Sequence, residues 1–476
     1  MKIFGKGAEN PFYKKGFPQI KALKNKFDRF LFGDWFFPFC AAVAVLSWQT
    51  GAYWTYAVHI AVSVFAVILI YLLFFCETIL PAVPIVAVLS YMLPGNFKLG
   101  GFGPYIPLAV WLTLIVAGFV YYFVKRKPAF QKSRLFWPTV VFGAAMFFAG
   151  LLSPWYFEGV NFLMILYLGL LYPFVTILLF NTARLTLEYV AKTILTAGAV
   201  ILLEMLLYYA GVDAHGQYKA IHLGWGMSNN MATVFTMAIV ASFYLSLTKG
   251  KADVYYAVAA FVFIVALLFT ESRGCIFLLA AALPFIVGFY LCRSARGERG
   301  RRAAILLICT AVSLAASLIF IDEVASVFAL LKEMGLKENG RTELYKEAWE
   351  VFKGRPIFGA GFAYPTQLIP MGPLYPVHNT ILQFMASGGI VGVGACLYLF
   401  GSRYRLLYDA YEPKLIFFAI LMLLFEIYGM VEMATFCPYA VFLTCVLFNA
   451  LEQEHAAKGK GMIRRRKFLE RKKWIF

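Results

Sequence analysis

One stretch of the sequence gathers residue types that can activate a hydroxyl group and hold a phosphate. It opens on Arg341, passes a Gly-Ala-Gly turn at 359–361, and ends on His378-Asn379. A histidine can accept a proton near neutral pH, and the guanidinium fork of an arginine matches a phosphate group. Because an apolar run begins directly after Asn379, we expect His378 at the mouth of a membrane helix. We interpret His378 as a candidate general base, although a single loop histidine is more often an ordinary surface residue.

A second candidate lies at 272–274, where Ser-Arg-Gly separates two apolar runs with almost no loop. Charge at membrane depth is costly and tends to be functional, and Arg273 can bind phosphate through its N–H donors. An ion pair with Glu271, or a contact with a lipid headgroup, is an equally weighted alternative for this arginine.

A third candidate is the polar segment 211–230, which contains Asn229 and Asn230. Side-chain amides both donate and accept hydrogen bonds, so they suit the hydroxyl groups of a sugar. For each residue taken singly, a solvated loop with a helix cap at Ser228 is the favoured alternative.

The composition is that of an integral membrane protein. Of the 476 residues, 62% are hydrophobic and 14% are charged, whereas a soluble domain has about 25% charged residues. The net charge of +18 does not indicate nucleic-acid binding, because the cations lie in short loops and at both ends of the chain. The cysteines share no CxxC spacing, so we expect small apolar core residues and neither a disulfide framework nor a metal site.

Apolar runs of membrane-spanning length recur along the chain. About fourteen are predicted, over 33–49, 54–75, 77–93, 105–124, 136–152, 160–180, 189–210, 227–247, 254–270, 274–292, 303–321, 379–400, 414–431 and 436–451. The loops between them alternate between many cations and few, which is typical of cytoplasmic and outward loops, respectively. We therefore expect both termini in the cytoplasm and the longest polar segment outside the cell membrane.

The sequence thus predicts an all-α, polytopic transmembrane bundle of about 12–14 helices, with one large extracytoplasmic loop that contains short helices. The expected parts are a basic amphipathic N-terminus (1–32), transmembrane helices (33–321), the outward loop (322–377), further transmembrane helices (378–451) and a basic cytoplasmic tail (452–476). A disordered basic tail is the alternative for the N-terminus. A loop this long among many short ones usually carries function.

Inside the outward loop the sequence predicts an amphipathic helix over 341–353. It should end at the Gly-Arg-Pro step at 354–356, because proline disfavours a helical conformation in the residue before it. In the apolar helix predicted over 379–400, Gly388 and Gly392 are four residues apart, a spacing that lets membrane helices pack closely.

Several common chemistries find no support in the sequence. P-loop, nucleophile-elbow and H-E-x-x-H motifs are missing, and the outward acids form no D-x-D pair. We therefore expect a mechanism that uses neither a metal ion nor a cofactor.

Three features together resemble the O-antigen ligase and polymerase superfamily of bacterial membrane glycosyltransferases. They are Ser272-Arg273-Gly274 between two apolar runs, Arg341 followed by Trp349 and Arg355-Pro356-x-x-Gly359-x-Gly361, and His378-Asn379 followed after nine residues by Gly389-x-x-Gly392. Each motif is short, but their order and spacing over about 270–400 are specific in combination. One position departs from the pattern: some members have a leucine four residues after the loop arginine, where this chain has Tyr345.

The resemblance implies an enzyme that transfers or polymerises an undecaprenyl-diphosphate-linked oligosaccharide at the outer face of the cytoplasmic membrane. Its acceptor would be a saccharide or glycolipid, and membrane lipids, but no nucleic acid, would be its other partners. Arg273 and Arg341 would stabilise the diphosphate as leaving group, and His378 would activate the acceptor hydroxyl. Because of the departure at Tyr345, Arg355 is an alternative to Arg341. The candidate substrate-binding residues are Arg355, Asn379, Trp349, Asn229 and Asn230.

Two questions stay open at this point. Only the acceptor distinguishes a ligase from a polymerase, and the sequence does not choose between them. The alternative function is a polytopic transporter or flippase for lipid-linked saccharides. A flippase should carry its charges in a central cavity along many helices, whereas here they gather at one face and in one loop, which favours the enzyme.

Overall fold

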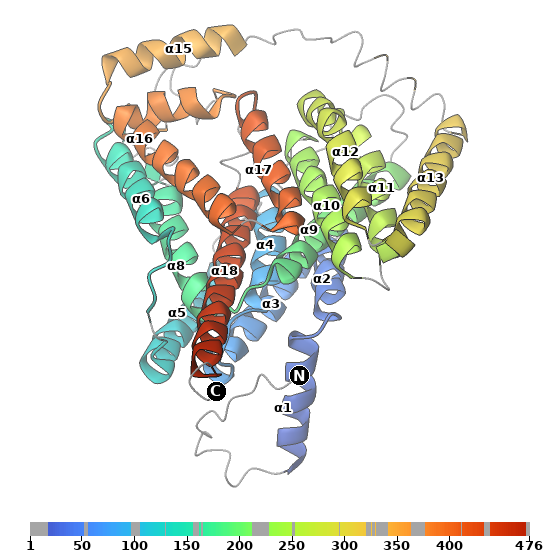
Figure 1. Ribbon diagram of the computed structural model, residues 1–476. Helices are drawn as coiled ribbons and strands as arrows, with labels where there is room; N and C mark the ends of the chain where they lie inside the picture. The colour runs from blue at the N-terminus through green and yellow to red at the C-terminus, as the bar shows by residue number, and fades with distance from the viewer. Residues whose placement is uncertain are drawn as a thin grey trace.

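The computed structural model describes residues 18–51, 56–96, 105–128, 130–155, 161–162, 165–211, 228–249, 253–294, 296–319, 325, 329, 341–362, 377–410, 412–432 and 438–472. Most of the predicted outward loop 322–377, and residues 212–227 before Asn229, lie outside this part of the chain. All regular elements within it are helices, which confirms the predicted fold class (Figure 1).

Each predicted apolar run overlaps a helical segment, and the run at 160–180 is a π-helix, η2 (Ile165–Leu171), continued by α8 (Tyr172–Thr182). The other helices are α1 (Pro18–Leu31), α2 (Phe36–Gly51), α3 (Tyr56–Phe75), α4 (Ala82–Asn96), α5 (Tyr105–Arg126), α6 (Phe136–Leu151), α9 (Leu187–Gly211), α10 (Ser228–Thr248), α11 (Asp253–Leu268), α12 (Arg273–Arg293), α13 (Arg296–Ile319), α15 (Arg341–Gly354), α16 (Thr380–Asp409), the short η5 (Pro413–Leu415), α17 (Ile416–Gly429) and α18 (Pro438–Lys472). The helix predicted over 341–353 is confirmed as α15.

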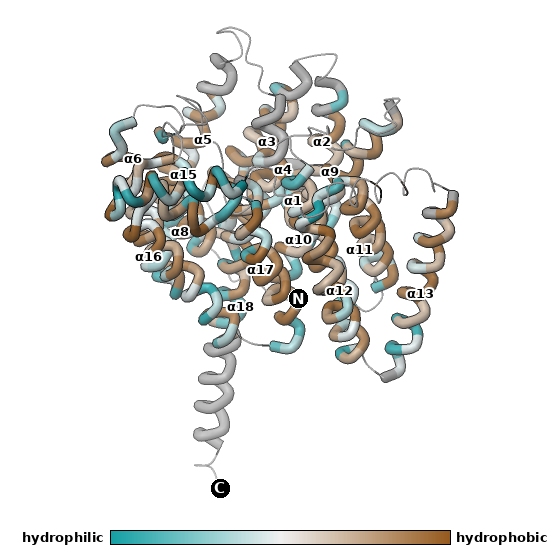
Figure 2. Tube along the Cα trace, turned by 90° about the horizontal axis from the view of Figure 1, so that it is seen from above, coloured by the Kyte–Doolittle hydropathy of each residue, from teal (hydrophilic) through white to brown (hydrophobic). Residues whose placement is uncertain are grey.

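The helices form the bundle of a multi-pass membrane protein. Among the described residues, five helical segments are long and apolar enough to cross a membrane, namely η2 with α8, α9, α10, α12 and α16. The pair α1 and α2, bent by 76°, adds a sixth if it is one span. Helix α1 and the end of α18 lie at one end of the bundle, and the hydrophilic α15 lies across the other (Figures 1 and 2). The cytoplasmic placement of the termini stays a prediction.

Helix α10 is the centre of the packing, and every residue from Met231 to Ser246 is buried. Small side chains on it let its neighbours approach closely, so that a Cβ on Gly198 of α9 would lie 2.9 Å from the Ala238 Cβ. The hydroxyl of Ser242 donates to the carbonyl of Ala238 one turn earlier at 2.7 Å, which keeps that polar group satisfied in an apolar setting. The first residues of α10 are therefore held in a fixed position.

The cysteines behave mainly as the sequence predicts. The described cysteines are free thiols, and those at 40, 76, 275, 396 and 445 are buried. The prediction that the cysteines are core residues is wrong for Cys292, which is exposed near the end of α12.

The glycine-rich helix α16 is broken at Gly389, which corrects the single continuous helix predicted over 379–400. Gly389 has φ +61°, and residues 356–362, here called the strap, run beside the break. Four backbone hydrogen bonds join the strap to the break: Ala360 N to Ala386 O at 2.9 Å, Gly361 N to Ser387 O at 3.0 Å, Ile390 N to Pro356 O at 2.8 Å and Val391 N to Ile357 O at 3.2 Å. Backbone groups that the break would otherwise expose are thus paired with the strap.

Glycine is required on both sides of this junction. A Cβ on Gly389 would lie 2.3 Å from the carbonyl oxygen of Ile357, and one on Gly359, whose φ is +70°, would lie 2.3 Å from the backbone of α16. The predicted close packing at Gly388 and Gly392 is confirmed. A Cβ on these residues would lie 3.2 Å and 3.1 Å, respectively, from the methyl group of Met146 in α6.

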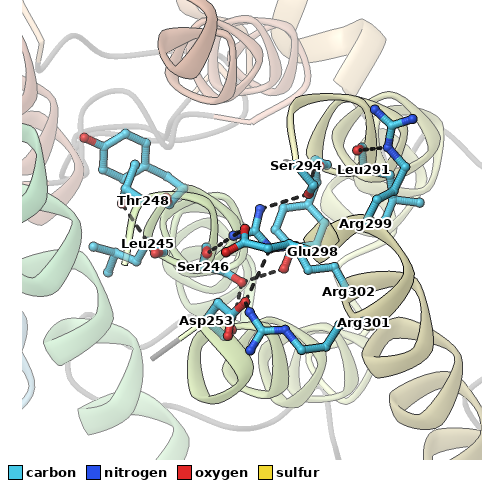
Figure 3. A network of polar contacts seen from close by, with 12 residues as sticks. Leu245, Ser246, Thr248, Asp253, Leu291, Ser294, Glu298, Arg299, Arg301 and Arg302 are labelled. Atoms are coloured by element: carbon cyan, nitrogen blue, oxygen red, sulfur yellow. Dashed lines mark hydrogen bonds and ion pairs between the residues drawn. The ribbon is translucent and has the colours of Figure 1, made fainter. Parts of the chain in front are cut away.

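A polar cluster ties α10, α11, α12 and α13 together at the end of the bundle away from α15 (Figure 3). Asp253 is 0% exposed and forms ion pairs with Arg301 and Arg302. Arg302 is 2% exposed, donates to the Ser294 hydroxyl at 2.9 Å and lies over the ring of Tyr290 at 5.3 Å. We call these five residues the inner clamp. A buried charge is tolerated only with such partners. Because Arg301 and Arg302 belong to α13, their contacts with Asp253 hold the first part of α13 against α11.

Candidate active site

His378 stands directly before α16 in a strained backbone conformation. Its φ is +54°, in the left-handed region that non-glycine residues occupy rarely. The hydroxyl of Tyr345 in α15 donates to the His378 carbonyl oxygen at 3.3 Å, and the Asn379 side chain caps α16 by accepting from the Leu382 N–H at 3.0 Å. The predicted position of His378 at the start of a helix is confirmed, and neighbours on both sides hold it there.

The start of α16 is tied to the end of α17 by two side chains. The amide nitrogen of Asn379 donates to the Met430 carbonyl at 3.1 Å, and the hydroxyl of Thr380 donates to the Gly429 carbonyl at 2.8 Å. The Asn379 amide is therefore engaged within the protein through its oxygen and its nitrogen, and its role in substrate binding stays a prediction. These contacts bring the residues after α17 beside His378.

The carboxylate of Glu432, just after α17, joins side chains from three other elements. Its contacts are His378 Nδ1 to Oε1 at 2.6 Å, Asn229 Nδ2 to Oε2 at 2.6 Å and Arg341 Nη2 to Oε2 at 3.7 Å. We call these four residues the outer hub. The side chain of Glu432 is 10% exposed, whereas His378 is 22% and Arg341 31% exposed. The hub is thus anchored on a buried acid and reachable at its histidine and arginine.

The hub can move a proton and hold an anion. An ionised carboxylate only accepts hydrogen bonds, so the contact with Glu432 requires a hydrogen on Nδ1 of His378, and a neutral imidazole held in this way presents the lone pair of Nε2. Arg341 lies too far from Glu432 for a hydrogen bond, so its guanidinium can turn toward a second anion. Within the described residues no group of three or more His, Cys, Asp or Glu side chains could hold a metal ion, and metal independence stays a prediction.

Arg273 begins α12 beside the same end of α17. The hydroxyls of Ser272 and Tyr428 are 3.2 Å apart, and a Cβ on Gly274 would lie 2.7 Å from the Tyr428 ring. The backbone N–H of Glu432 donates to the Tyr428 carbonyl at 2.9 Å, so this tyrosine connects the Ser-Arg-Gly step to the hub. These contacts place the start of α12 beside the residues that follow α17, and the role of the Arg273 side chain stays a prediction.

Two other predicted substrate-binding residues, Arg355 and Trp349, lie away from the hub, and Asn230 directly follows the hub residue Asn229. Arg355 follows the far end of α15, a helix of 14 residues and hence about 20 Å long, and packs over the ring of Trp155 at 6.0 Å. Trp349 stands beside Phe352, with ring centroids 5.4 Å apart. The backbone carbonyl of Asn230 accepts from the Tyr439 hydroxyl at 2.9 Å. The loop arginine that meets the hub is therefore Arg341, not its alternative Arg355.

Sequence reasoning missed Glu432. It is 54 residues from His378 and 203 from Asn229 along the chain, so no local spacing links them. One signal was available: Glu432 is an acid between the apolar runs 414–431 and 436–451, and charge near a membrane span is costly enough to need a purpose.

Comparison with known proteins agrees with the motifs. Residues 258–397 match the family model described as O-Antigen ligase, which confirms the resemblance inferred over about 270–400. The matched segment contains Arg273, Arg341 and His378, whereas Asn229 and Glu432 lie outside it and join the hub only through the fold. No curated protein shows a significant sequence match to the chain.

Proposed function

We propose, from the premise that residues 258–397 form an O-antigen ligase domain, that the protein transfers a lipid-linked oligosaccharide to a sugar acceptor. The donor would be carried by undecaprenyl diphosphate at the outer face of the cytoplasmic membrane. The observation that carries the proposal is the 2.6 Å contact of His378 Nδ1 with Glu432, where Arg341 meets the same carboxylate. The family match supports a membrane glycosyltransferase-like enzyme in general, and the donor, acceptor and metal independence are our extension of it.

His378 is the proposed general base. Glu432 holds Nδ1, so Nε2 takes the proton of the acceptor hydroxyl while the hydroxyl oxygen attacks the anomeric carbon. A positioned base of this kind contributes about 10²- to 10⁴-fold to the rate. Glu432 would keep the imidazole in this tautomer and stabilise the imidazolium that forms, as a buried aspartate does in serine hydrolases.

Arg341 and Arg273 are the proposed holders of the diphosphate. As the new C–O bond forms, the bond from the anomeric carbon to the diphosphate oxygen breaks, and its electron pair leaves with the diphosphate. Two guanidinium groups can take up that charge without a metal ion, and a single displacement inverts the anomeric centre. Each arginine is the first residue of its helix, where the helix dipole also favours an anion.

The same chemistry serves a ligase and a polymerase. Transfer to another lipid-linked repeat would make the protein a polymerase, and transfer to a glycolipid core or another terminal sugar would make it a ligase. Both need the base and the two arginines, so the proposal covers both acceptors.

The test uses purified protein in lipid vesicles with a synthetic undecaprenyl-diphosphate disaccharide as donor and acceptor. Release of undecaprenyl diphosphate is measured for the intact chain, His378→Ala and Arg341→Ala. We expect losses of about 10²- to 10⁴-fold for the histidine and about 10²-fold for the arginine. His455→Ala, which changes a histidine in the middle of α18, about 25 Å along the helix from its start, is the control and should keep full activity.

Two results would overturn the proposal. Unchanged release by a well-folded His378→Ala protein would remove the general base. Movement of the disaccharide lipid across the vesicle membrane without any release of diphosphate would identify a flippase instead.

A further inference from the structure

The far end of α15 and the strap expose large apolar side chains together. Trp349 is 45% exposed, Ile357 59% and Phe358 37%. Phe352 stands next to Trp349 and completes a patch that we call the foot, made of these four residues. A surface surrounded by water rarely exposes such a group of side chains, so the foot requires an occupant.

The foot continues the lipid-facing surface of two neighbouring helices. The carbonyl of Pro356 in the strap accepts from the N–H of Ile390, a residue of α16 that is 66% exposed. The carbonyl of Ala360 in the strap also accepts a hydrogen bond from Ser153, which directly follows Leu152, the C-cap residue of α6, and Leu152 is 52% exposed. In a multi-pass membrane protein, the outward apolar side chains of such helices face acyl chains. The strap is therefore placed at the edge of the lipid phase.

Basic side chains border the foot. Lys353 is 51% exposed, and Arg355 is exposed with its guanidinium 6.0 Å from the centre of the Trp155 ring. Tryptophan flanked by lysine and arginine is typical of segments at the boundary between headgroups and acyl chains. Glu350, 67% exposed, forms an ion pair with Lys353 at 2.6 Å, and the exposed Glu343 lies two turns earlier in α15.

We propose that the foot is seated in the membrane leaflet on the side of the outer hub. Its aromatic and aliphatic side chains lie at the top of the acyl chains, and Lys353 and Arg355 lie at the lipid phosphates. The occupant of this surface is phospholipid.

The consequence is a fixed height for the hub. Helix α15 has the foot at one end and Arg341 at the other, about 20 Å away along a rigid helix. Seating the foot among the headgroups holds Arg341 near the level at which a lipid-borne phosphate lies. The seating itself does not depend on glycosyl transfer, so it can be tested whether or not the proposed function holds.

The experiment places a fluorophore on the foot. Phe358→Cys and Trp349→Cys are labelled in a Cys292→Ser background and reconstituted in phosphatidylethanolamine and phosphatidylglycerol vesicles. Quenching is compared for a lipid with a nitroxide near its headgroup, a lipid with a nitroxide at its chain end, and aqueous iodide. Glu343→Cys, at an exposed position of α15 two turns before Glu350, is the matched control, and labelling of the background protein is subtracted.

We expect the shallow nitroxide to quench both foot positions at least threefold more strongly than it quenches the control, with iodide showing the reverse order. Equal quenching of foot and control by iodide would place the foot in water and overturn the proposal. Protection from all three quenchers would also overturn it, because another protein surface would then cover the foot. Gel filtration identical to that of the background protein establishes folding for each variant.

Discussion

Two carboxylates of similar chemistry sit at opposite ends of this molecule. Glu432 gathers His378, Asn229 and Arg341 in the outer hub, and Asp253 gathers Arg301 and Arg302 in the inner clamp. The difference is the exposure of the carboxylate and of its close partners. Glu432 is 10% exposed and its histidine and arginine are 22% and 31% exposed, whereas Asp253 is 0% and Arg302 2% exposed, and in the clamp it is Arg301, at 48%, that reaches the surface. Charge clustering by itself therefore does not identify a site; a polar group must also be reachable by a ligand.

Backbone geometry separates the two regions as well. His378 is held at φ +54°, and Asp253 begins α11 in ordinary helical geometry, where an acid in the first turn complements the helix dipole. Strain that is kept by surrounding contacts is frequent at functional sites. The hub thus combines backbone strain with an accessible histidine, whereas the carboxylate of the clamp, Asp253, is neither strained nor exposed.

The largest effect on stability should come from breaking the clamp. Asp253→Ala removes one of the two carboxylates that pair with the buried Arg302 and leaves Glu298 at 3.0 Å, which should cost about 3 kcal/mol of folding free energy. Thermal unfolding in detergent measures the loss. Asp409→Ala, which removes an ion pair with Arg134 between side chains 36% and 51% exposed, is the control and should cost less than about 1 kcal/mol. Equal shifts for the two variants would contradict the distinction drawn between buried and accessible pairs.

The matching change in the hub should affect turnover instead. Glu432→Gln keeps the shape of the side chain but can donate to Nδ1, which favours the wrong tautomer of His378. We expect a loss of about 10²-fold in donor turnover and a change in unfolding temperature of only a few degrees. Glu350→Gln, an exposed acid on α15, should leave turnover unchanged. A fall in stability as large as that of Asp253→Ala would make Glu432 a structural residue.

Disturbing the junction between the strap and the break in α16 should lower stability by less than breaking the clamp does. Gly389→Ala forces a side chain into φ +61° and against the carbonyl of Ile357, which should cost about 1–3 kcal/mol. Gly394→Ala in the same helix meets nothing within 4 Å and should be neutral or slightly stabilising. Unfolding temperatures of the two variants, measured side by side, test the assignment. A neutral Gly389→Ala would show that the strap tolerates a continuous α16.

The smallest effect is expected at the arginine that the structure separates from the hub. Arg355→Ala removes a cation over the ring of Trp155, worth about 0.5–1 kcal/mol at an exposed site, and should change donor turnover less than about fivefold. A loss as large as that of Arg341→Ala would restore Arg355 as the diphosphate-binding residue.

The sequence determined the elements of this protein because they depend on neighbours along the chain. Apolar runs located the helices, the proline at 356 marked the end of α15, and Asn379 marked the start of α16. The order of the three motifs was enough to predict the family model that residues 258–397 match. His378 and Arg341 could be nominated because each belongs to a local pattern with known chemistry.

Only the tertiary structure decided which of these residues meet. Glu432 has no local pattern, and its partners come from α10, α15 and the start of α16, so their convergence depends on packing. The break at Gly389 was equally hidden, because the strap that pairs with it is about 30 residues away and periodicity favours a continuous helix. Contacts between segments distant in the sequence therefore showed which candidate residues lie together in one site. They placed Arg341 in the hub and Arg355 outside it.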